Sequence, residues 1–95
     1  MHKRDFRDPL YKEWRRRIRK RDGFTCKMPG CSRGGKNVQI HHIKRWADYP
    51  SLRYEDSNGI SLCSFCHKIV TNNEVYYEQL FSNIISAIYD NNSRH

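Results

Sequence analysis

The segment GISLCSFCHKIV, residues 59–70, contains the clearest structural pattern in this chain. Its first part, GISLC, predicts a short β-strand. Its second part, SFCHKIV, indicates the start of a helix that carries Cys66 and His67. The strand would therefore run directly into the helix through a Cys-x2-Cys step, which holds His67 beside the second cysteine.

A second pair of cysteines lies upstream, in the turn-rich segment FTCKMPGCSRGGKN. Two closely spaced pairs are typical of a tetrahedral zinc site, in which each pair presents two sulfurs to one ion. We expect one structural zinc ion, which would supply folding energy that a polar chain of 95 residues, 37% of them hydrophobic, otherwise lacks. Two disulfides are the alternative. The expected ligands are Cys26, Cys31, Cys63 and Cys66.

Whether the cysteines bind zinc or form disulfides depends on the redox state of the protein's compartment. No apolar stretch follows the opening MHKRDFRD, and no run approaches the length of a membrane span, so we expect no secretory signal and no membrane association. The expected location is a reducing cytoplasm, where cysteines more often bind metal than form bridges. A disulfide-rich secreted protein is accordingly disfavoured.

Two adjacent histidines lie in NVQIHHI, which predicts a first β-strand. Neighbouring side chains on a strand point to opposite faces, so His41 and His42 are expected to point in different directions. Asn58 lies in a Ser-Asn-Gly turn just before the second strand. Alone, each of these residues is better explained as a packing or turn residue. Together with His67 they form a strand-turn-strand-helix arrangement that carries three histidines.

The run CKMPGC…VQIHHI…DSNGISLCSFCH resembles the HNH endonucleases, also called ββα-metal or His-Me finger nucleases. The resemblance covers about residues 26–71, and the lead-in YKEWRRRIRKRDGFTC is similar to free-standing phage and homing-type members. It implies an α+β fold: a small ββα-metal domain with an N-terminal basic helix, a C-terminal amphipathic helix and a four-cysteine zinc site. It also implies a divalent-metal-dependent DNA endonuclease that hydrolyses phosphodiester bonds.

The resemblance assigns roles to individual residues. His42 takes the place of the general base, while His41 and His67 take the places of ligands to the catalytic ion. Asn58 either braces the loop and orients His42 or touches the ion. Many members have an acidic residue in place of His41, so the ion could be Mg²⁺ or Mn²⁺, with Ni²⁺, Co²⁺ and Zn²⁺ as alternatives. Some members also have a further helix histidine where this chain has Thr71, so we expect weak binding of the ion.

Positive charge is concentrated in the first part of the chain. The formal net charge is +8, and ten of the eighteen Lys and Arg residues lie between Lys3 and Arg21. Such a patch favours a polyanion, and nucleic acid is the usual one; a solvated helix face is the alternative. The expected DNA contacts are Arg15, Arg16, Arg17, Arg19, Lys20, Lys44, Arg45 and Lys68.

The remaining segments predict the domain organisation. Asp8 and Pro9 suit a helix start, Gly23 suits its end, and an apolar stripe is expected at Leu10, Trp14 and Ile18. Residues 44–59 are expected to form a loop. We expect one domain over residues 1–95, made of a basic lead-in (1–25), the zinc-clamped core (26–71) and a helix (73–90). The apolar residues of that helix are Tyr77, Leu80, Phe81, Ile84, Ile85 and Ile88.

A second function is compatible with the same sequence. A zinc-stabilised nucleic-acid-binding module would share the basic helix and the cysteines but would have no need of His42. The nuclease hypothesis includes double-stranded DNA as partner, a monomer or weak dimer, and a partner protein as a candidate source of sequence specificity. One active site per chain cuts one strand at a time, so both nicking and double-strand cleavage are open.

Overall fold

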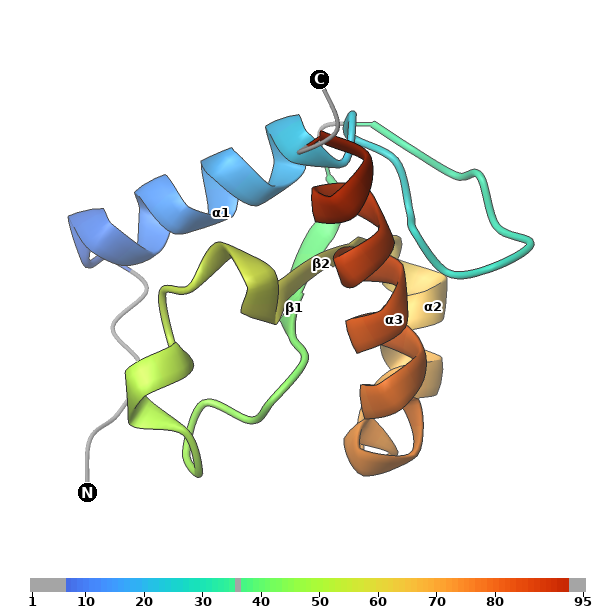
Figure 1. Cartoon of the computed structure of the whole chain (residues 1–95). Coiled ribbons are helices and arrows are strands. Elements are labelled where there is room, and N and C mark those ends of the chain that lie inside the picture. Colours follow the sequence, from blue (N-terminus) through green and yellow to red (C-terminus); the bar gives the residue numbers. More distant parts are fainter. Residues whose placement is uncertain (1–6, 36, 93–95) are drawn as a thin grey trace.

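The structure is a computed structural model that describes residues 7–35 and 37–92 (Figure 1). A two-stranded hairpin lies at its centre, and Figure 1 shows α1 along one side of the hairpin and α2 and α3 toward the other. The elements, in chain order, are α1 (Pro9–Arg21), β1 (Gln39–His42), the 3₁₀ turns η1 (Pro50–Leu52) and η2 (Asp56–Asn58), β2 (Gly59–Leu62), α2 (Ser64–Val70) and α3 (Glu74–Asn92).

The register of the hairpin separates its two faces. β1 and β2 are antiparallel, with His41 opposite Ile60 and His42 opposite Gly59. Because side chains alternate along a strand, His41 and Ile60 share one face, and His42 and Gly59 share the other. The two adjacent histidines therefore face different helices.

Each face of the hairpin supports its own hydrophobic core. The first core lies between the hairpin, α2 and α3, and its buried members are Cys26, Ile43, Ile60, Leu62, Cys66, Val70, Phe81 and Ile85. The second core lies between the hairpin and α1, and its buried members are Tyr11, Trp14, Ile18 and Ile40. The division follows the strand alternation, since Ile60 and Ile40 belong to opposite faces.

The start of α1 agrees with the expected capping, but the buried stripe does not. The Asp8 side chain accepts a hydrogen bond from the Leu10 amide at 2.9 Å, and Pro9 occupies the first turn. The expectation that Leu10 is a core residue is wrong, because its side chain is 62% exposed. Tyr11 is buried in its place, beside Trp14 and Ile18. Positions 10 and 11 lie on opposite sides of Trp14 around the helix, so the periodicity alone did not show which of them faces the hairpin.

The C-terminal helix is longer than expected and only partly buried. It runs from Glu74 to Asn92, compared with the expected 73–90. Phe81 and Ile85 are buried, whereas Leu80 is 39% exposed and is not a core residue. The first core is small, and it covers only one narrow stripe of this helix.

A buried ion pair ties the end of α1 to the hairpin. The Asp22 carboxylate is buried and accepts hydrogen bonds from the Arg21 guanidinium, at 2.8 Å and 3.0 Å, and from the Ser61 amide at 2.9 Å. Arg21 also donates to the main-chain oxygens of Asp56 and Gly59 at 2.7 Å. Both charges are thus paired and hydrogen-bonded, which burial requires.

In the described part of the chain, no helix is long and apolar enough to cross a membrane.

Gly59 allows α1 to approach the hairpin closely. A Cβ atom at this position would lie 2.6 Å from Cζ2 of Trp14 and 3.0 Å from Cγ1 of Ile18. We expect Gly59→Ala to lower the free energy of unfolding by about 1–3 kcal/mol, the usual cost of overpacking. Urea denaturation checks this value. In a Trp14→Phe background the same substitution should cost less, and equal costs in both backgrounds would show that the approach of Trp14 is not the cause.

Candidate metal centre and active site

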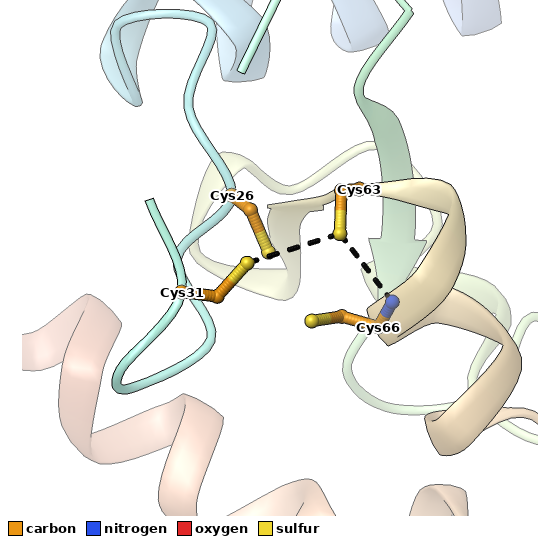
Figure 2. Close-up of side chains that lie close together, drawn as sticks. All are labelled: Cys26, Cys31, Cys63 and Cys66. Atoms are coloured by element: carbon orange, nitrogen blue, oxygen red, sulfur yellow. Dashed lines mark hydrogen bonds between the residues drawn. The ribbon is translucent and has the colours of Figure 1, made fainter. Parts of the chain in front are cut away.

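Four cysteines gather at one point between the loop after α1 and the start of α2 (Figure 2). Their sulfur atoms all lie within 4.8 Å of one another, and all four are free thiols. Cys26 and Cys31 come from the turn after α1, Cys63 caps α2 and Cys66 lies in its first turn. The Sγ atoms of Cys31 and Cys63 are 3.9 Å apart, and the Cys66 amide donates to Cys63 Sγ at 3.4 Å. The arrangement has the two-pair geometry of a metal knuckle.

The thiols have unequal acidities, and the causes are local. The hydrogen bond from the Cys66 amide is the main reason that the pKa of Cys63 falls to about 7. Burial raises the pKa of the Cys26 and Cys66 thiols. Four sulfurs this close cannot all ionise without a cation among them, since like charges repel strongly in a poorly solvated site. The donor set therefore fits a divalent metal that prefers four thiolates.

Three histidines line a second site, a cavity of about 320 Å³. His41 and His42 come from the end of β1, and His67 comes from α2. The His41 and His67 rings lie edge to face, with centroids 6.0 Å apart, and His41 also packs against Phe81 at 5.7 Å. The structure thus brings together the three histidines that the sequence singled out. Among the described residues, the four cysteines are the one group of three or more His, Cys, Asp or Glu side chains whose ligand atoms lie close enough together to hold a metal ion.

His42 is held tightly on the α1 side. Its side chain is buried, and its ring stacks on Trp14 with centroids 4.3 Å apart and planes 19° apart. Trp46 approaches the ring edge at 5.5 Å. His42 Nε2 lies 2.9 Å from the main-chain oxygen of Arg53. Because a carbonyl oxygen can only accept, Nε2 carries the proton, and Nδ1 is the nitrogen that can accept one in the neutral ring.

Asn58 acts on the loop rather than on the histidine cavity, which it does not line. Its Oδ1 accepts from the Lys44 amide at 2.8 Å, and its Nδ2 donates to the main-chain oxygens of Lys44 and Leu52 at 3.1 Å. Leu52 immediately precedes Arg53, whose carbonyl oxygen binds His42. Of the two expectations for Asn58, this geometry corresponds to the one in which it braces the loop.

The basic residues predicted to contact DNA divide into two groups. Several already have partners: Arg17 binds Asp56 in a bidentate pair, Arg19 donates to the Val38 carbonyl oxygen at 3.1 Å, and Lys44 pairs with Glu78. Arg15 is partly buried and lies over the Tyr11 ring. The others are exposed, although two of them also make weak ion pairs with neighbouring acids, and they are Arg16, Lys20, Arg45 and Lys68.

The sequence did not identify two residues of the site: Trp14, which stacks on His42, and Glu74, which lines the cavity. Trp14 stood out only as an apolar helix residue, and nothing in its spacing placed it on His42. Glu74 lines the histidine cavity from the first turn of α3. Burial disfavours its charge, but the amides of Glu74 and Asn72 and the positive charges of His41 and Arg45 outweigh burial and lower the pKa of Glu74. Its place depends on the turn between α2 and α3, where Asn72 has a positive φ of 68°; the two asparagines indicate a helix cap but not the direction in which the chain turns.

A hairpin with two histidines, a helix with a third and a cysteine knuckle joining them define a small ββα domain with four cysteines positioned to bind a metal ion. A family model described as HNH endonuclease matches residues 26–73, the segment that contains the hairpin, the knuckle and α2. The chain belongs to the HNH endonuclease family, as the sequence motif predicted. No significant match was found among curated proteins or among solved structures.

Proposed function

We propose that this chain is a divalent-metal-dependent DNA endonuclease in which His42 is the general base and His41 and His67 hold the catalytic ion. Membership of the HNH endonuclease family supports nuclease activity in general. The observation that carries the specific proposal is the convergence of these three histidines on one cavity of about 320 Å³. A pure binding module has no need of such a cavity.

The surroundings of His42 suit a base. The hydrogen bond to the Arg53 carbonyl oxygen fixes the tautomer, so Nδ1 takes the proton from the attacking water. Stacking on Trp14 fixes the plane of the ring. Asn58 holds the loop that supplies the Arg53 carbonyl, which makes Asn58 a positioning residue rather than a catalytic one. A pre-oriented base needs little rearrangement to reach the transition state.

The opposite side of β1 suits a metal ion. His41 and His67 present two imidazoles to the cavity, and imidazole binds a wide range of divalent ions. When bound, the ion supplies charge neutralisation at the scissile phosphate and at the leaving oxygen. Strand alternation supports this division of roles, because His41 and His42 lie on opposite faces of β1 while both line the cavity.

The knuckle has a separate, structural role. We propose that the four cysteines hold one Zn²⁺ ion, since four thiolates match its usual tetrahedral site. Such a closed site has no position for substrate. Its contribution is to join the loop after α1 to α2, which fixes His67 relative to the hairpin.

Double-stranded DNA is the proposed substrate, bound through the basic surface of α1. Beside that helix lies a groove of about 680 Å³, lined by Pro9, Lys12, Glu13, Arg15, Arg16, Arg19 and Phe24. Arginine and lysine contacts to phosphates position a duplex without reading its sequence. We therefore propose that the sequence specificity of this chain is low, or that a partner protein supplies it.

Salt dependence tests the binding surface. Removing one side chain that binds a phosphate should reduce the slope of log binding constant against log salt concentration by about one. We expect Arg16→Ala and Lys20→Ala each to reduce the slope in this way. Arg17→Ala, the control, removes a guanidinium already paired with Asp56 and should change the slope less. Fluorescence anisotropy with a labelled duplex measures the slopes, and a wild-type slope near zero would refute electrostatic binding.

Cleavage of supercoiled plasmid tests the proposed activity. The protein with its zinc is incubated without further divalent ion, with Mg²⁺ or with Mn²⁺, beside a His67→Ala variant. We expect cleavage that needs the added ion and is lost in the variant, with open circles appearing before linear DNA. Binding without cleavage under every ion condition would support the non-catalytic module instead.

A further inference from the structure

One cavity-lining residue, Glu74, has no part in the mechanism above. α2 ends at Val70 and α3 begins at Glu74, and the turn between them is well bonded. The Thr71 amide donates to the His67 carbonyl oxygen at 2.9 Å, and the Asn73 amide donates to the Val70 carbonyl oxygen at 2.8 Å. This tight reversal returns the chain beside α2, and Glu74 becomes part of the wall that also contains His41 and His67.

The position that could supply a further ligand from α2 itself is already engaged. Thr71 follows His67 by one helical turn and lines the cavity, but its hydroxyl donates to the His67 carbonyl oxygen at 2.7 Å. The cavity therefore has two imidazoles from β1 and α2, and among the described residues its lining carboxylate comes from α3. Two imidazoles alone favour softer ions, whereas a carboxylate oxygen favours Mg²⁺ and Mn²⁺.

We propose that Glu74 is the third protein ligand of the catalytic ion, completing a site of two imidazoles and one carboxylate with His41 and His67. This inference rests on the proposed metal-dependent activity. Glu74, on α3, would take the role of the further helix histidine that some family members have where this chain has Thr71. It also makes the site more selective for hard divalent ions than the two histidines alone would be.

A structural role for Glu74 has a different signature. A carboxylate in the first turn of a helix interacts favourably with the helix dipole. Loss of that interaction would lower thermal stability and leave ion affinity unchanged. Glu78 offers a matched control, since it lies one turn further along α3 and pairs with Lys44 outside the cavity.

Titration calorimetry with MnCl₂, on protein that holds its zinc, separates these cases. We expect wild type and Glu78→Gln to bind one Mn²⁺ with similar affinity and Glu74→Gln to bind it at least about tenfold more weakly, because loss of a direct ligand should cost no less than loss of a supporting group. The loss should be smaller when NiCl₂ replaces MnCl₂. Melting curves recorded before the ion is added show whether each variant is folded.

Each other result has a definite meaning. If Glu74→Gln binds Mn²⁺ as wild type does while His67→Ala loses it, the assignment of Glu74 is wrong and the histidine site remains. A lower melting temperature with unchanged Mn²⁺ affinity would make Glu74 a helix-capping residue only. If wild type itself takes up no Mn²⁺, both the Glu74 ligand and the proposed metal site are overturned.

Discussion

Replacing His42 with glutamine is expected to slow DNA cleavage by about 10²–10⁴-fold, the usual contribution of a general base. Glutamine can still donate a hydrogen bond to the Arg53 carbonyl oxygen and fill much of the space beside Trp14, but it cannot take a proton from water at neutral pH. The measurement is the single-turnover rate of plasmid cleavage with Mn²⁺ present. The dissociation constant of a labelled duplex should stay within about twofold of the wild-type value. His42 is buried and therefore has little exposed surface that could contact a phosphate.

Two comparisons make the result specific to His42. Gln39→Ala changes an exposed residue of the same strand and should cut at the wild-type rate. His42→Ala removes the stack on Trp14 as well as the base, so it should lose stability in addition to activity. A His42→Gln protein that cleaves as fast as wild type would show that another group activates the water.

Removing the proposed zinc ion from the knuckle is expected to unfold the domain. The apparent free energy with which zinc-finger peptides bind a structural zinc ion is about 10–16 kcal/mol at neutral pH. This matches or exceeds the free energy of unfolding of most small domains, which is about 5–15 kcal/mol. Here the knuckle supplies two of the eight buried residues of the first core, Cys26 and Cys66. Circular dichroism during chelation should therefore show loss of helix, and addition of Zn²⁺ should restore it.

The stoichiometry and a matched pair of variants test that expectation. Metal released on denaturation should amount to one zinc ion per chain. Cys63→Ser should resemble the chelated protein, whereas Ser64→Ala, at the exposed next position, should keep its metal and its helix content. A chelated protein with unchanged helix content would mean that the two hydrophobic cores suffice for folding.

The elements were largely predictable because their signals are local. Asp8 and Pro9 mark the start of α1, and the alternating run with His41 and His42 marks β1. The four cysteines were predictable as one cluster because their spacing leaves few other arrangements. Each of these inferences depends on residues within a few positions of one another, or on a motif with strict order.

The errors and omissions concern the packing of distant segments. Leu10 and Tyr11 are equally suitable for a buried stripe until the hairpin selects one of them. Arg17 stays a predicted DNA contact, but its pairing with Asp56, 39 positions away, had no sign in the local sequence. Glu74 reads as an ordinary residue of a helix start until the turn after α2 returns it to His67. Tertiary packing decides all three, and no local pattern records it.

The division of the interior into two cores would separate the loss of the proposed catalysis from the loss of the proposed zinc ion. His41 packs on Phe81 of the first core, and His42 packs on Trp14 of the second. Local opening of α1 alone would leave the knuckle and His41 in place while His42 loses its support. For the proposed nuclease, gentle heating is therefore expected to switch cleavage off reversibly before the proposed zinc ion is released, so that activity recovers on cooling without a new supply of metal.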